Sequence, residues 1–150
     1  MKVELAKMAG FCFGVNRAVD TVYQEAVEHS PVYTYGPIIH NEEVVTDLGK
    51  KGVRVLENEQ ELKNLMEGTV VIRSHGVPKE IYEVIEEKGL ECVDATCPFV
   101  RKIHKIVERE SKAGRHIIIV GNDTHPEVEG IKGWCEGPVT VISSHEEAEN

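Results

Sequence analysis

Hydrophobic residues recur along the chain with two alternating periods, one typical of strands and one typical of helices. Short β-branched runs predict strands at residues 3–7, 32–35, 53–56, 69–73, 90–93, 116–120 and 139–142. Apolar residues at helical spacing predict helices at residues 14–28, 42–49, 59–66, 79–88, 99–114 and 127–135, several of them closed by a glycine. Strands that alternate with helices form βαβ units, so we expect an α/β fold built from small parallel sheets.

The composition and charge of the 150 residues narrow the class of protein. With 41% hydrophobic and 29% charged residues, the chain has the profile of a soluble globular protein. The net charge of −9 and the lack of a dense Lys/Arg cluster argue against a nucleic-acid binder, although local donors can still hold a small anion. The longest apolar run, residues 117–120, is far shorter than a membrane span, and residues 1–10 lack the apolar segment of a signal peptide. These features predict a cytoplasmic protein that has no membrane partner.

Two of the four cysteines stand directly before predicted helices. Cys12 lies in GFCFG at residues 10–14, and Cys97 lies in DATCP at residues 94–98, where Pro98 suits the first helical position. Sulfur at a helix start meets free N–H groups and the positive end of the dipole, which stabilise the thiolate that binds metals. The alternative is that each is a small buried apolar residue, since their spacing matches no standard ferredoxin or zinc ribbon.

The other two cysteines have a different setting. Cys92 falls within a predicted strand, and Cys135 falls at the end of an apolar helix face. We expect both to be packing residues, because a cytosolic protein seldom uses disulfides and neither stands at a helix start.

Three histidines each follow a strand and precede a helix. His40, His75 and His125 would lie outside the carboxyl ends of the strands, where ligands bind in open α/β sheets, beside helix starts that attract phosphate. Such groups can hold a diphosphate without a Gly-rich nucleotide loop, and the chain has no fingerprint for ATP or NAD. A single histidine in this position is usually an ordinary loop residue. The remaining histidines lack this context and are expected on the surface or on helices: His29, His104, His116 and His145.

Glu127 follows His125 by two residues. If the site shields it from water, its carboxyl group can donate a proton. Equally, it can be a helix N-terminal carboxylate that complements the dipole.

Four motifs together resemble one family. GFCFGV at residues 10–15, RSHGV at 73–77, DATCP at 94–98 and HPEVEG at 125–130 are similar, in this order, to the 4-hydroxy-3-methylbut-2-enyl diphosphate reductase family of iron–sulfur enzymes. The resemblance covers the whole chain.

The resemblance implies a chemistry and a set of roles. In that family a 4Fe-4S cluster is bound by three cysteines, of which Cys12 and Cys97 match two, and His40, His75 and His125 match the substrate-binding histidines. Glu127 matches the glutamate credited with proton delivery. The implied reaction is reductive dehydroxylation of the diphosphate substrate to isopentenyl and dimethylallyl diphosphate, with electrons from a ferredoxin or flavodoxin.

The resemblance also implies that part of the enzyme is missing. The family has three α/β units with approximate three-fold symmetry, and its third cysteine and a Ser-x-Asn segment lie beyond residue 150. We therefore expect residues 1–13 to hold a strand and the Cys12 loop that belong with an absent third unit, residues 14–97 to form the first unit, and residues 98–150 to form an incomplete second unit. Residues 144–150 have the pattern of a helix that is only beginning, and we expect a truncated chain that is inactive alone.

Three other interpretations stay open at this point. The chain can be a non-catalytic module that binds zinc through Cys92 and Cys97 with nearby histidines. It can be an interaction fragment whose core another chain completes. A hydrolase that uses histidines alone is a third alternative, but the sequence shows no nucleophile pattern for it.

Overall fold

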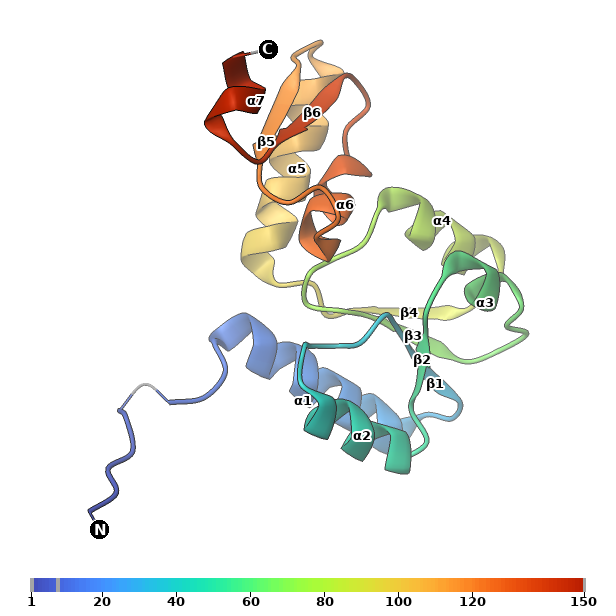
Figure 1. The fold of residues 1–150 in the computed structure, drawn as a ribbon. Coiled ribbons are helices and arrows are strands. Elements are labelled where there is room, and N and C mark those ends of the chain that lie inside the picture. Colours follow the sequence, from blue (N-terminus) through green and yellow to red (C-terminus); the bar gives the residue numbers. More distant parts are fainter. Residues whose placement is uncertain (1, 8, 150) are drawn as a thin grey trace.

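The computed structural model describes residues 2–7 and 9–149, and strands alternate with helices along it (Figure 1). The strands are β1 (Val32–Tyr35), β2 (Arg54–Leu56), β3 (Thr69–Ile72), β4 (Glu91–Asp94), β5 (Ile117–Val120) and β6 (Val139–Ile142). The helices are α1 (Phe13–Glu28), α2 (Glu42–Lys50), α3 (Glu59–Lys63), α4 (Lys79–Glu87), α5 (Pro98–Lys112), α6 (Pro126–Lys132) and α7 (His145–Glu149). The α/β fold class predicted from the sequence is confirmed.

Strands β1 to β4 form one parallel sheet in the order β2-β1-β3-β4. Tyr33 of β1 is paired with Val70 of β3, and Val70 in turn with Cys92 of β4. Because β3 is central, all four of its residues are buried, which is why its sequence is an unbroken β-branched run.

Helices cover both faces of this sheet, and successive strand residues point to opposite faces. On one face Val70 and Ile72 pack with apolar residues of α3 and α4. On the other face Val71 packs with apolar residues of α1 and α2, among them Val22 and Leu48. The fold around this sheet therefore has three layers and two apolar cores. We call it the four-strand region, residues 13–97.

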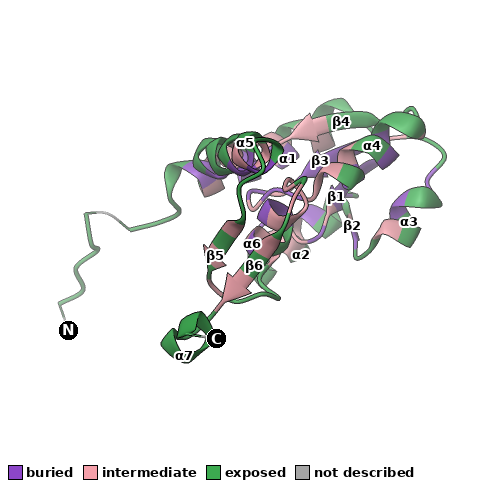
Figure 2. Cartoon of the chain, turned by 90° about the horizontal axis from the view of Figure 1, so that it is seen from above, coloured by how far each residue is buried: buried purple, intermediate pink, exposed green. Residues whose placement is uncertain are grey.

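The second sheet is smaller. Strands β5 and β6 are parallel, with Ile117 paired to Val139, and α5, α6 and α7 accompany them. We call this part the two-strand region, residues 98–149. Burial is concentrated in the four-strand region, whereas most of β5, β6 and α7 is exposed or half-buried (Figure 2).

Three predicted elements differ from the structure. Residues 3–7 form no strand; they extend away from the rest of the chain (Figure 1), and Val3 is 78% exposed. A short segment becomes a strand only by pairing, and no strand pairs with it among the described residues. The predicted helix at residues 59–66 ends at Lys63, and the one at residues 127–135 ends at Lys132. No helix in the described part of the chain is long and apolar enough to cross a bilayer.

Candidate functional site

The structure brings the three singled-out histidines into one row. The ring centroids of His40 and His75 are 5.0 Å apart, and those of His75 and His125 are 5.8 Å apart. We call these three side chains the histidine row. His40 lies in the β1–α2 loop, His75 in the β3–α4 loop and His125 at the N-cap of α6. Since β1 and β3 are adjacent and parallel, their carboxyl ends deliver the first two rings to the same edge.

Helix α6, which carries His125, passes close to the loop that carries His75 at two glycines. A Cβ added to Gly130 would lie 3.5 Å from the carbonyl carbon of Gly76, in the loop that carries His75. At Gly133 the fit is closer, because an added Cβ would lie 2.7 Å from Cα of Pro78 and would force the backbones apart. A Cβ at Gly130 would make only an ordinary van der Waals contact, so it is the lack of a side chain at Gly133 that allows α6 of one region to contact a loop of the other.

His75 is the central ring, and its surroundings disfavour a positive charge. Burial, then the neighbouring His40, Arg73 and His125, lower the pKa of His75 from 6.5 to about 4. Its Nδ1 is buried and has no hydrogen-bond partner among the described residues. An anion placed against this ring would oppose all of these causes and satisfy the free nitrogen, so the row is suited to an anionic ligand.

His125 and Glu127 are joined by the cap of α6. The main-chain N–H of Glu127 donates to Nδ1 of His125 at 3.2 Å. With Nδ1 accepting, the neutral ring of His125 carries its proton on Nε2, which leaves Nε2–H as a donor for a ligand. Glu127 lies half-buried in the first turn of the helix. Both interpretations of this carboxylate, proton donor and dipole partner, are compatible with that place.

Cys12 and Cys97 are the N-cap residues of α1 and α5. Neither helix has a side-chain cap or an acidic residue in its first turn, unlike α2 and α3, whose N-caps Asn41 and Asn58 accept from the backbone. The free N–H groups of α1 and α5 therefore leave the two sulfurs as the available negative partners. Cys12 is exposed and Cys97 is half-buried.

The two helix starts lie next to each other. A Cβ added to Gly14 would lie 2.6 Å from Sγ of Cys97, so this sulfur rests on the first turn of α1, two residues after Cys12. Arg17 of α1 links this helix to the segment before α5, because its guanidinium donates to the carbonyls of Thr96 (3.1 Å) and Asp94 (3.2 Å).

The cysteine side of the site is connected to the histidine row. The N–H of Cys97 donates to the carbonyl of Ser74 at 2.9 Å, and Ser74 directly precedes His75. The hydroxyl of Ser74 lies 3.4 Å from the carbonyl of Ile38, in the loop that leads to His40. Hydrogen bonds therefore connect Cys97 through the His75 loop to the His40 loop.

The predictions for the other cysteines were partly wrong. Cys92 was expected to pack but is exposed, because β4 is an edge strand. Cys135 lies beyond the end of α6, half-buried, with its Sγ 3.5 Å from the carbonyl of Ile131. Among residues 2–7 and 9–149, no group of three or more His, Cys, Asp or Glu side chains is arranged to hold a metal ion.

His104 had been expected on the surface or on a helix. It is on α5, but it is only 2% exposed, and its ring stacks on Trp134 with centroids 5.3 Å apart. Its place between Val100 and Val107, on one helical face, was the signal for burial in the sequence. His29, His116 and His145 are exposed, as expected. Arg73, part of a quoted motif, also lies beside the histidine row, and the sequence did not single it out.

Comparison with known proteins places this arrangement in a family. The chain is 51% identical over 153 residues to the 4-hydroxy-3-methylbut-2-enyl diphosphate reductase of Caldanaerobacter subterraneus subsp. tengcongensis, and the match covers all of this chain and 53% of that protein. A protein of the same name from Geobacter metallireducens is 46% identical, with 99% and 51% covered. The chain thus spans about half the length of the curated relatives it matches.

Solved structures agree with the sequence matches. One, described as (E)-4-hydroxy-3-methyl-but-2-enyl diphosphate reductase, the terminal enzyme of the non-mevalonate pathway, has a TM-score of 0.81 at 42% identity and covers 95% of this chain and 51% of its own. The Plasmodium falciparum E-1-hydroxy-2-methyl-but-2-enyl-4-diphosphate reductase has a TM-score of 0.88 at 29% identity, with 96% and 45% covered. Residues 3–150 match the family described as LytB protein, and the chain belongs to that family.

Proposed function

We propose that these residues form about half of a 4-hydroxy-3-methylbut-2-enyl diphosphate reductase, which removes the substrate's hydroxyl group and yields isopentenyl and dimethylallyl diphosphate. The observation that carries the proposal is the histidine row beside two helix starts whose N-cap residues are cysteines. Relatives that bear the reductase name at 42–51% identity support it. Overall, the substrate takes up two electrons and two protons, its C–O bond breaks, and one water molecule leaves.

In this proposal the histidine row binds the diphosphate end of the substrate. Nε2–H of His125 is free to donate, and His75 has an unpartnered buried nitrogen. Phosphate oxygens accept from such donors, and their negative charge raises the pKa of His75, which burial has lowered. A hollow of about 490 Å³ lies beside His40, lined by Ile39, Asn41 and Val45 among others. It offers room next to the row for a small ligand.

Glu127 is the proposed proton donor. Its backbone is bound to His125, so its carboxyl group stays at the start of α6 next to the row. Protonation of the departing hydroxyl oxygen by this carboxyl group turns a poor leaving group into water.

Cys12 and Cys97 would hold a 4Fe-4S cluster. Their fit to the cluster rests on two adjacent helix starts with free N–H groups, which stabilise thiolates and donate to cluster sulfur. When bound, the cluster supplies single electrons and a Lewis-acidic iron for the hydroxyl oxygen. The described residues offer no complete ligand set, so a further ligand has to come from outside this half. A ferredoxin or flavodoxin in the cytoplasm is the electron donor that the family resemblance implies.

The experiment compares this chain with the complete natural polypeptide that carries it. After anaerobic reconstitution, we expect iron, absorption near about 400 nm and substrate reduction in the complete polypeptide only. Cys97→Ser should remove both the absorption and the activity. Glu127→Gln should keep the absorption and substrate binding but lose most activity, with exposed His116→Gln as the control that loses nothing. Reduction at an undiminished rate without Cys97, or by the 150 residues alone, would refute the proposal.

A further inference from the structure

Arg73 is a half-buried cation for which the described residues provide no counter-ion at contact distance. It follows β3 directly and precedes His75 by two residues. Its Nε is buried and has no hydrogen-bond partner among residues 2–7 and 9–149, and no ion pair to Arg73 occurs in that part of the chain. Buried donors without partners are rare in folded proteins, so the buried Nε of Arg73 beside a ligand edge is available to an acceptor from a ligand.

Gly36 makes room for this guanidinium. Gly36 follows β1 and has a φ of +67°, a conformation that favours glycine. A Cβ at this position would overlap Nη1 of Arg73. The guanidinium therefore lies across the end of β1, against the loop that continues to His40, and its orientation is held by the backbone that it covers.

Arg73 adds a fixed positive charge to the histidine row. It is one of the groups that lower the pKa of His75, together with His40 and His125. Two further groups face the guanidinium: the phenol of Tyr35 on β1 and the carboxylate of Glu129 on α6. Burial lowers the pKa of Arg73 itself, and an arginine still remains charged at neutral pH. An anion at this edge would pair with the permanent cation Arg73 and would favour protonation of the neighbouring imidazoles.

We propose that Arg73 is a fourth anion-binding side chain of this edge, and that its guanidinium donates to oxygens of the same phosphate group that the histidine row receives. The identity of the anion as a diphosphate rests on the proposed function, whereas the presence of an anion site rests on Arg73, Gly36 and the histidines. A guanidinium is planar and offers parallel donors that match two phosphate oxygens, which a lysine cannot reproduce.

The test measures the affinity for inorganic pyrophosphate by calorimetry, using the complete natural polypeptide that carries these residues. Arg73→Met should weaken binding about 10- to 100-fold, because it removes a charge-assisted pair of hydrogen bonds. Arg73→Lys keeps the charge but lacks the parallel donors of the guanidinium, and should weaken binding about 3- to 10-fold. Arg54→Met on the edge strand β2 removes the same charge away from the row and should leave the affinity unchanged. Unaltered affinity in Arg73→Met, or no pyrophosphate binding by the unsubstituted protein, overturns the proposal.

The variant Glu129→Gln distinguishes between two roles of Arg73, binding of the anion and ion pairing with Glu129. If Arg73 receives the anion, removing the nearby carboxylate should tighten pyrophosphate binding about 2- to 5-fold, since a competing negative charge is lost. If Arg73 is instead an ion-pair partner of Glu129, Glu129→Gln lowers the stability of the protein without tightening pyrophosphate binding, and the proposal is wrong. The Glu129→Gln measurement stays informative even where Arg73→Met fails to fold.

Reductase activity measured on the same preparations distinguishes the two proposals. If the protein binds pyrophosphate through Arg73 but reduces no substrate, the anion site is supported and the reductase function is refuted. If the protein reduces substrate and the KM is the same in the unsubstituted protein, Arg73→Lys and Arg73→Met, the reductase function is supported and the role of Arg73 is refuted.

Discussion

The central strand of the four-strand region and the first strand of the two-strand region have similar sequences and very different surroundings. β3 reads Thr-Val-Val-Ile and is buried along its whole length, whereas β5 reads Ile-Ile-Ile-Val and is alternately half-buried and exposed. Ile118 and Val120 are 63% and 79% exposed. The more apolar strand is therefore the less covered one. Burial of a strand depends on which layers are packed on it, and its own hydrophobicity only makes that packing favourable.

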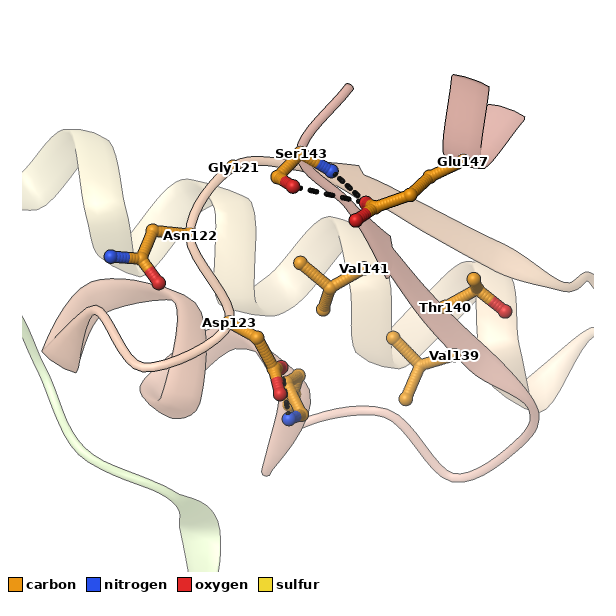
Figure 3. Close-up of a pocket in the computed structure, with 9 residues that line it drawn as sticks. Gly121, Asn122, Asp123, Val139, Thr140, Val141, Ser143 and Glu147 are labelled. Carbon is orange, nitrogen blue, oxygen red and sulfur yellow. Dashed lines mark hydrogen bonds and ion pairs between the residues drawn. The ribbon is translucent and has the colours of Figure 1, made fainter. Parts of the chain in front are cut away.

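The two regions differ because of the layers around the sheets. β3 has a strand on each side and helices above and below, while β5 pairs only with β6 among the described strands. Figure 3 shows Val139 and Val141 beside an open hollow that Asp123 and Glu147 also border. On α5 the buried face holds Val100, His104 and Val107, and three apolar side chains remain exposed: Phe99, Ile103 and Ile106.

The largest expected effect contrasts two isoleucines, one in each region. Ile72→Ala in β3 removes a fully buried side chain and should lower the free energy of unfolding by about 3–4 kcal/mol, from lost burial and the cavity left behind. Ile118→Ala in β5 removes the same atoms from an exposed site and should change it by less than about 0.5 kcal/mol. Urea unfolding of both variants measures the difference, and equal losses would contradict the comparison.

A second prediction concerns the place where the two regions meet. Gly76 has a φ of +73°, and an added Cβ would lie 2.5 Å from Cε1 of His104 on α5. Gly76→Ala should lower the free energy of unfolding by about 2–3 kcal/mol, from backbone strain together with the clash. Gly52→Ala is the matched control, because Gly52 has a φ of +90° with open space around it and should lose only about 1 kcal/mol. Equal losses in the two variants would mean that the contact between the regions is not tight.

The third prediction is a pH dependence that originates in the two-strand region. Burial is the main cause that lowers the pKa of His104 from 6.5 to about 4. The unfolded chain therefore takes up this proton below about pH 6.5 while the folded chain resists it, so stability is complete above pH 6.5 and is lost as the pH falls toward 4. His104→Phe keeps a ring against Trp134 and should remove about 2 kcal/mol of that acid-induced loss.

Urea midpoints at pH 7 and pH 4.5 measure this effect. The loss of stability in acid should persist fully in the exposed control His116→Phe. It should persist in part in His104→Phe, because the pKa of His75 is lowered in the same direction. An identical acid loss in His104→Phe and in the unchanged chain would show that His104 is not the group responsible.

The smallest expected effect tests the hydrogen bond between the regions. Nε1–H of Trp134 donates to the carbonyl of Val77 at 2.9 Å. Trp134→Phe removes the donor and part of the ring, and should lower the free energy of unfolding by about 1 kcal/mol. Hydrogen exchange should quicken at α6 more than at β3, since α6 depends on this contact and β3 does not. Uniform quickening across both regions would instead indicate that they unfold as one unit.

The sequence by itself determined the local structure and which residue types stand at the candidate site. Hydrophobic periodicity located the helices and strands of the folded body, because helix and strand periods are local properties of the backbone. Capping rules placed Cys12 and Cys97 at helix starts, and the histidines at loops that follow strands. These features depend on neighbours within a few residues, which a sequence displays directly.

Only the tertiary structure decided which of these features meet and which are covered. It left residues 3–7 without a partner strand among the described residues, exposed Cys92 at a sheet edge and buried His104 against Trp134. It also set Arg73 across Gly36 beside the histidine row. Burial and long-range contact depend on the layers that pack on an element, and those layers come from residues tens of positions away, whose packing no local period records.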